Sequence, residues 1–177
     1  MSLAPMGSLA PPLRRLGAVA AAVAALLGAG CASSDLSRNA EITGEVAECL
    51  PVGTPAPSAV ARAIWFPNAS GFGSASDSPM GHVTGVLALA GDRLWFMTWN
   101  AAEHHFDMRH VIAFLTAARI GVDRLGPSAM LVVQSGNLSF DGFELMNAGA
   151  LGSDPKLTLD LCERLRVLRA KAPQPDP

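Results

Sequence analysis

The feature that most limits the fold of this chain is a series of short apolar runs between residues 60 and 145, each ended by turn-forming residues. Runs of this length suit strands better than helices, which need about 10–12 residues. The runs at 83–89 and 93–99 are separated by Ala90-Gly91-Asp92, a spacing typical of a β-hairpin. The pattern therefore predicts a mostly antiparallel β domain.

Other strands are predicted at 60–66, 104–108, 111–122, 129–133 and 138–145. Pro67 is expected to end the first of them, because proline has no N–H to donate within a sheet. In the last one the apolar positions shift at Asp141-Gly142, which predicts either a β-bulge or a hairpin turn. We favour the bulge, because a turn would leave very short arms.

The last predicted element is a helix that begins at Pro155, with Asp154 as its N-cap. Its apolar residues recur at three- and four-residue spacing and so share one face: Leu157, Leu161, Leu165 and Leu168. The sequence thus predicts an α+β domain over residues 60–171. In it about seven short strands form a curled sheet or barrel capped by the helix, and a disordered tail follows at 172–177.

This order of elements resembles the PH-like superfold and, within it, the GRAM-type arrangement. The residues that carry the resemblance are the hairpin at 85–96, the strand at 112–120, Leu131-Val132-Val133 followed by Phe140 and Phe143, and the terminal helix. In phosphoinositide-binding PH domains the loop between the first two strands carries basic residues. Here the same loop has no basic residue, and its only charged residue is Asp77. The resemblance therefore implies a fold without phosphoinositide binding. A closed barrel of another topology and an α+β sandwich are the alternative folds.

The beginning of the chain predicts a location. Arg14 and Arg15 precede an uncharged apolar run at 16–29, which is the order of a secretory signal peptide. The run is shorter than the about 20 residues of a membrane span. Cys31 stands where cleavage is expected, and the segment resembles a bacterial lipoprotein signal, although Gly28 stands where leucine is usual. The resemblance implies that residues 1–30 are removed and that Cys31 carries the lipid.

Residues 31–59 are expected to form a lipid-anchored tether with a Pro-rich linker. Ala32 and Ser33 follow Cys31, without an aspartate at the position that commonly signals inner-membrane retention, so the resemblance implies the inner leaflet of an outer membrane, facing the periplasm. The alternative is an ordinary secreted protein cleaved near Ala32. The lipid would be the means of membrane attachment, because the only lysines are Lys156 and Lys171 and the net charge is −2. The same composition argues against nucleic-acid binding, which needs several basic contacts to phosphates.

Cys49 and Cys162 remain once Cys31 is assigned to the lipid. In an oxidising compartment they could form a disulfide. The alternative is a buried, unpaired Cys162 at a contact between the helix and the sheet. Neither is expected to be a catalytic thiol.

The residues best suited to bind a metal or take part in catalysis lie between Glu103 and His110. Imidazoles and carboxylates this dense could bind a transition metal, and the candidate ligands are His104, His105, Asp107 and His110. However, His104 and Asp107 would point to opposite faces of a strand, and the His-Glu-x-x-His spacing of zinc hydrolases is absent from the sequence. A metal site is therefore the weaker expectation, and we expect no cofactor.

Aromatic residues suggest a binding surface. Trp95 and Phe96 are neighbours on a strand, so one of them should face away from the core unless both faces are covered. Together with Trp99 and Phe72, Trp95 could form a surface for an envelope protein or peptide. The sequence thus favours an interaction or structural module over an enzyme. The alternative is a periplasmic metal-binding protein or a metal-dependent hydrolase that uses residues 103–110.

Overall fold

The computed structural model describes residues 40–69, 81–125, 128–136, 139–146 and 152–172. The expected signal peptide at 1–30, the lipidated Cys31, Phe72 of the expected binding surface and the tail from residue 173 lie outside the described residues. The account that follows concerns the described residues alone.

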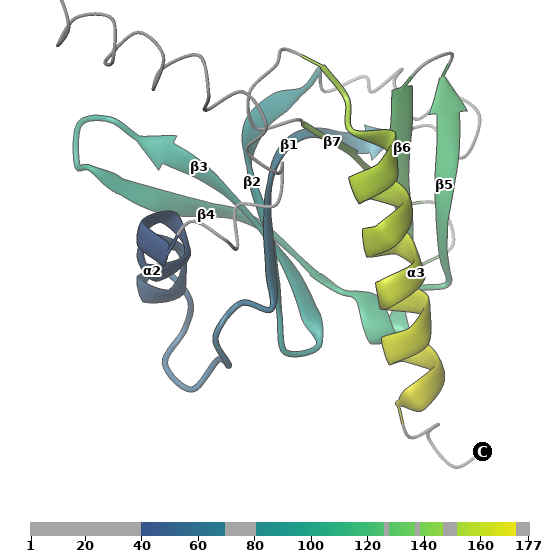
Figure 1. The fold of residues 1–177 in the computed structure, drawn as a ribbon, viewed down its shortest axis with the longest axis horizontal. Coiled ribbons are helices and arrows are strands. Elements are labelled where there is room, and N and C mark those ends of the chain that lie inside the picture. The colour runs from purple at the N-terminus through teal and green to yellow at the C-terminus, as the bar shows by residue number, and fades with distance from the viewer. Residues whose placement is uncertain (1–39, 70–80, 126–127, 137–138, 147–151, 173–177) are drawn as a thin grey trace, which may run out of the picture. The chain divides into compact units, whose positions relative to one another are not determined.

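Seven antiparallel strands form a sheet with the order β4-β3-β2-β1-β7-β6-β5 (Figure 1). The strands are β1 (Ala59–Ala69), β2 (Val83–Ala90), β3 (Arg93–Asn100), β4 (His105–Ala113), β5 (Arg119–Leu125), β6 (Ser128–Ser135) and β7 (Ser139–Leu145). The helices are α2 (Ala40–Glu48), the short 3₁₀ helix η2 (Phe114–Thr116) and α3 (Pro155–Lys171). The α+β class and the C-terminal helix are confirmed.

The sheet is open, with β4 and β5 as its edges, so the expected barrel is wrong, and the sheet is not strongly curled. The chain passes from β4 to β5 through η2, which contacts β3, β6 and α3. This helical turn therefore connects the two edge strands and contacts both halves of the sheet.

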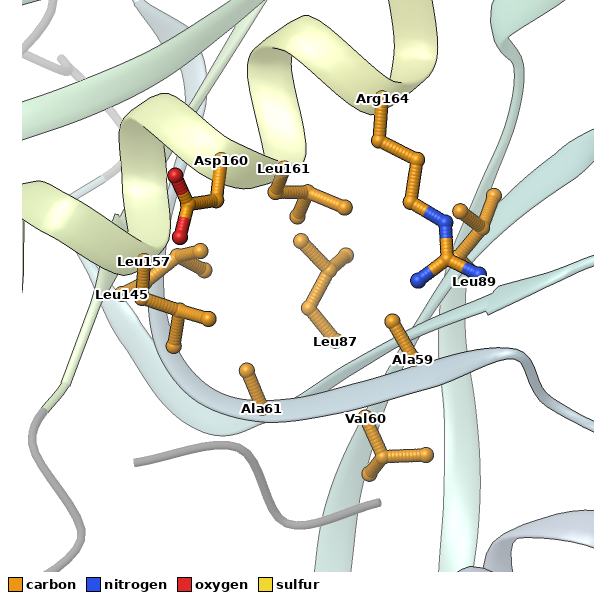
Figure 2. Close-up of a pocket in the computed structure, with 10 residues that line it drawn as sticks. All are labelled: Ala59, Val60, Ala61, Leu87, Leu89, Leu145, Leu157, Asp160, Leu161 and Arg164. Atoms are coloured by element: carbon orange, nitrogen blue, oxygen red, sulfur yellow. The ribbon is translucent and has the colours of Figure 1, made fainter. Parts of the chain in front are cut away.

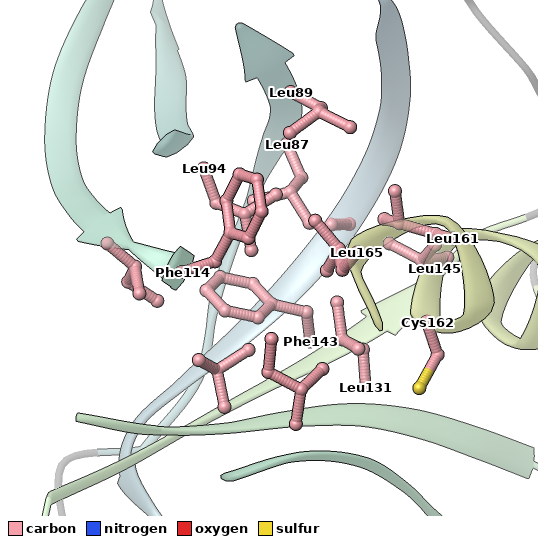
Figure 3. Close-up of a cluster of buried hydrophobic side chains, with 14 of the residues drawn as sticks. Leu87, Leu89, Leu94, Phe114, Leu131, Phe143, Leu145, Leu161, Cys162 and Leu165 are labelled. Carbon is pink, nitrogen blue, oxygen red and sulfur yellow. The ribbon is translucent and has the colours of Figure 1, made fainter. Parts of the chain in front are cut away.

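The two faces of the sheet carry separate hydrophobic clusters because successive side chains of a strand point to opposite faces. On β2, Leu87 and Leu89 belong to the cluster beneath α3, whereas Val86 and Ala88 belong to the cluster beneath α2. We call these sides the α3 face and the α2 face. The α3 face holds the main core, in which Phe114 and Phe143 pack with leucines from strands and helix (Figure 3).

Helix α3 begins as the sequence predicts. The Asp154 carboxylate accepts a hydrogen bond from the Leu157 backbone N–H at 2.9 Å, and Pro155 is the first helical residue. Leu161 and Leu165 are buried against the sheet. Leu168 is exposed, so the buried stripe ends one turn earlier than its spacing predicts.

Helix α2 lies within the segment expected to be a tether. Val46 and Leu50 are buried against the sheet, and Ile42 packs partly buried beside them. These residues are spaced four apart, which places them on one side of a helix. The polar residues between them hid this pattern. The following Pro-rich segment, residues 51–57, contains neither helix nor strand, as expected.

Three local predictions differ from the structure. The strand expected at 111–122 is divided by η2, because Phe114 and Ala117 both turn into the main core and interrupt the alternation of a strand. Strand β1 does not end at Pro67, but its register with β7 shifts between Phe66 and Ala69. Strand β7 runs without interruption through Asp141, so the irregularity favoured there lies in the facing strand.

Candidate functional site

The β3–β4 hairpin extends beyond the rest of the sheet and forms the candidate site (Figure 1). Pairing between β2 and β3 ends at Val86 and Met97, whereas pairing between β3 and β4 continues to Asn100 and His105. Gly85 lies where β2 departs, and a Cβ at this position would collide with the Met97 carbonyl oxygen. Residues 98–107 are therefore a two-stranded projection, which we call the hairpin arm.

A polar network covers one face of the hairpin arm, with Asp107 at its centre. The Asp107 carboxylate accepts hydrogen bonds from His105 Nε2 at 2.9 Å and from Asn100 Nδ2 at 3.2 Å. Arg109 pairs with the same carboxylate at 3.4 Å and donates from Nε to the Thr98 hydroxyl at 2.8 Å. These bonds link both strands of an arm that would be marginally stable as an isolated hairpin.

The opposite face of the hairpin arm is apolar. The Trp99 ring lies edge-on to Phe106, with ring centroids 5.0 Å apart. Phe106 is buried, but Trp99 is 46% exposed, and Met108, beside the base of the arm, is 40% exposed. Trp99 and Met108 therefore form an exposed apolar surface next to the cluster beneath α2.

The turn of the hairpin arm has an unusual backbone. His104 has a φ of 53°, a conformation that few residues other than glycine adopt. The Asn100 side-chain oxygen accepts hydrogen bonds from the backbone N–H groups of Ala102 and Glu103 at 3.1 and 3.3 Å. The His104 ring lies 6.5 Å from the Trp99 ring, so the turn brings this histidine beside the apolar face.

A second polar cluster lies on the α3 face, where β4, β1 and β7 contribute one residue each. The buried Asp141 carboxylate accepts hydrogen bonds from the Trp65 indole N–H at 2.9 Å and from His110 Nε2 at 3.1 Å. The rings of Trp65 and His110 are stacked 4.7 Å apart. Since β4 and β7 are separated by three strands about 4.8 Å apart from one to the next, the face must be concave for these side chains to meet. This cluster ties the two halves of the sheet together.

The structure divides the four candidate metal ligands among three places. His104 lies beside Trp99, His105 binds Asp107, and His110 binds Asp141. Within the described part of the chain, no group of three or more histidine, cysteine, aspartate or glutamate side chains is placed to hold a metal ion. The density of these residues in the sequence reflects two separate hydrogen-bond networks.

Both described cysteines are free thiols, so the disulfide that the sequence allowed is not formed. Cys49 packs with the cluster beneath α2 and Cys162 with the cluster beneath α3, so the sheet lies between them. Cys162 is buried at a contact between helix and sheet, which is the alternative that the sequence left open. Burial raises the pKa of the Cys162 thiol; nearby Arg166 opposes this rise and Glu163 adds to it.

The aromatic residues of the expected surface have different positions. Trp99 is exposed, whereas Trp95 is buried within the cluster beneath α2. The Trp95 indole N–H donates to the Ala90 carbonyl at 3.3 Å. Trp95 is therefore unable to contribute to a binding surface. Met108 is the exposed residue that the sequence interpretation missed. Its position opposite Met97 follows only from the register shift between β3 and β4.

No helix among the described residues is both long enough and apolar enough to span a membrane. Comparisons with models of known protein families, with curated proteins and with solved structures found no match to this chain.

Proposed function

We propose that this protein is a bacterial envelope lipoprotein, anchored through lipid on Cys31, whose folded domain is a binding module and not an enzyme. Its partner is an envelope protein that packs against the apolar face of the hairpin arm. Its expected position is the inner leaflet of the outer membrane, facing the periplasm. The lipid holds the domain near the bilayer, since each buried CH₂ of an acyl chain contributes about 0.8 kcal/mol.

The observation that carries the proposal is the exposed pair Trp99 and Met108 on a projecting arm. Tryptophan and methionine are enriched at the centres of protein interfaces, and tryptophan is among the residues that contribute most to binding energy. The polar network around Asp107 on the other face holds the arm in shape without a partner. The arm is thus prepared for binding in the free protein, which lowers the entropy lost on association.

We propose further that the fold is an open variant of the PH-like arrangement. Seven antiparallel strands followed by a C-terminal helix support this, as does the contact between His110 and Asp141 across the concave α3 face. The open edges of the sheet depart from it. A PH-like fold would not by itself identify the ligand, because one fold supports many functions.

Photocrosslinking in cells tests the binding proposal. A photoreactive amino acid replaces Trp99 in the full chain, and the matched control places it at Leu159, which is 41% exposed on α3. We expect an adduct with one envelope protein from position 99 only. The same adducts from both positions, or none from position 99, would contradict the proposal.

The captured protein is then purified and its affinity measured. Trp99→Ala should weaken binding by about 2 kcal/mol or more, which corresponds to a loss of about thirtyfold in affinity. Leu159→Ala should leave the affinity unchanged. Equal affinities for the wild type and Trp99→Ala would show that the arm does not contact the partner.

The lipid anchor is tested by cell fractionation. Cys31→Ser should move the protein from the membrane fraction to the soluble fraction, whereas Cys49→Ser should leave it in the membrane. Mass spectrometry of the mature N-terminus should find acyl chains on Cys31. A Cys31→Ser protein that stays in the membrane fraction would overturn the proposed anchoring.

A further inference from the structure

A cavity of about 140 Å³ lies on the α3 face, between α3 and strands β1 and β2 (Figure 2). Its walls are mostly aliphatic and are formed by Leu87, Leu89, Leu145, Leu157 and Leu161. The cavity is on the opposite side of the sheet from the apolar face of the hairpin arm, so it is a site independent of the proposed partner surface.

The cavity exists because β1 carries small side chains at this point. Ala59 and Ala61 face α3 among leucines of β2, β7 and α3. A larger side chain at either position would fill the space, as Trp65 does further along the same face of β1. The sequence of this strand therefore leaves an apolar space at the side of the main core.

Two charged residues of α3 line the opening. Asp160 and Arg164 are one helical turn apart, and Figure 2 shows Asp160 near Leu157 and Arg164 near Leu89, at opposite ends of the space. The Arg166 guanidinium is bound to the Ile120 carbonyl at 3.2 Å, whereas Arg164 has no hydrogen bond or ion pair among the described residues. Arg164 thus offers free donors beside an apolar space.

We propose that this cavity binds a monocarboxylate that carries an aliphatic group of about four to six carbons. Arginine is suited to hold a carboxylate through two parallel hydrogen bonds, and the aliphatic group would enter between the leucines. An apolar cavity of about 150 Å³ accommodates benzene, which sets the size of the group. Asp160 at the other end would repel a second carboxylate and so select against dicarboxylates.

Two sources share this chemistry: a free fatty acid and the apolar C-terminal residue of a peptide. Methyl NMR titrations of the purified full chain distinguish the two sources. Hexanoate represents a fatty acid and N-acetylleucine represents the C-terminal residue of a peptide, and the probe that binds more tightly identifies the source. Saturable shifts are expected for the methyl groups of Leu87, Leu157 and Leu161. Hexanol, hexylamine and the dicarboxylate adipate should bind at least about tenfold more weakly.

Three variants test the geometry. Arg164→Gln should weaken carboxylate binding about tenfold and leave hexanol binding unchanged, whereas Arg169→Gln, on the same helix outside the cavity, should have no effect. Ala59→Leu should fill the space and abolish binding without lowering the unfolding temperature. Absence of methyl shifts with both carboxylates, or equal binding of hexylamine, would overturn the proposal. Neither result bears on the hairpin arm, which is tested by Trp99→Ala.

Discussion

The two faces of the sheet are covered to different extents. On the α3 face a helix of 17 residues packs over a core drawn from both halves of the sheet. On the α2 face a helix of nine residues covers a smaller cluster, which is drawn from β1, β2, β3 and β4. Side chains of the same types, tryptophan and methionine, are buried at Trp95 and Met97 and exposed at Trp99 and Met108. The exposure of these tryptophan and methionine side chains therefore depends on how far the cover of α2 extends.

This difference assigns separate tasks to the two faces. The α3 face holds the structure together through its apolar core and through the cluster of Trp65, His110 and Asp141. The α2 face uses part of its apolar surface for packing and leaves Trp99 and Met108 exposed. Substitutions in the core of the α3 face should therefore affect stability, whereas substitutions of the exposed residues of the arm should affect the proposed binding of a partner.

The largest effect should come from Phe143→Ala in the core of the α3 face. Phe143 is fully buried, and truncation of such a side chain costs about 3–5 kcal/mol of unfolding free energy. Urea denaturation measures the change. Trp99→Ala is the matched aromatic truncation on the arm and should change stability by about 0.5 kcal/mol or less beyond its loss of contact with Phe106. Similar losses from both would show that the two faces are equally structural.

Asp141→Ala should have the next largest effect. It leaves the Trp65 indole and the His110 ring without their acceptor, and an unmet buried donor costs about 1–3 kcal/mol. Asp107→Ala, which removes the corresponding carboxylate from the exposed network of the arm, should cost less because water replaces the lost bonds. Chemical denaturation of both variants provides the comparison, and a greater loss for Asp107→Ala would contradict it.

A smaller effect is expected from Val46→Ala, which weakens the contact between α2 and the sheet. Removal of two buried methyl groups should cost about 1.5 kcal/mol. Hydrogen exchange should increase in α2 and around Trp95, with little change in α3. Equal acceleration in both helices would show that the sheet and its two coverings unfold as one unit.

The smallest effect should be the pH dependence that arises from Cys162. Burial raises the pKa of its thiol, so the folded protein keeps this proton to a higher pH than the unfolded chain does. As the pH rises above about 8.5, the unfolded chain loses the proton first and stability falls. Cys162→Ala should remove this part of the alkaline loss.

Thiol alkylation provides a second measurement for the cysteines. Cys49 is only partly buried, so it should react faster than Cys162 in the folded protein, and both should react in denaturant. Equal rates in the folded state would contradict the different burial of the two thiols.

Much of the fold could be predicted because the sequence marks it locally. Ala90-Gly91-Asp92 indicates the β2–β3 hairpin, and Asp154-Pro155 indicates the start of α3. Helix α2 was missed because its apolar residues are few and are separated by polar ones, although their spacing of four was a usable signal. The open sheet could not be predicted, since strand order and edge pairing depend on contacts distant in the sequence.

The candidate site was predictable only in part for the same reason. Trp99 is exposed and Trp95 is buried although both lie on the same face of β3, and the difference comes from α2, which is distant in sequence. The hydrogen bond between His110 and Asp141 joins residues 31 positions apart, so the local cluster of histidines gave no indication of it. The residue types indicated which side chains could form polar contacts, whereas the tertiary fold decided which of them lie together.

The register shift in β4 has a consequence for self-association. Between Met108 and His110, which pair with Met97 and Phe96, Arg109 is an extra residue at the outer edge of the sheet. Such irregularities, together with charged side chains, discourage a strand of another molecule from adding to an edge. The arm therefore exposes its aromatic surface while the backbone of its edge strand is a poor template for aggregation. The proposed binding through side chains is thus separated from strand addition through the main chain.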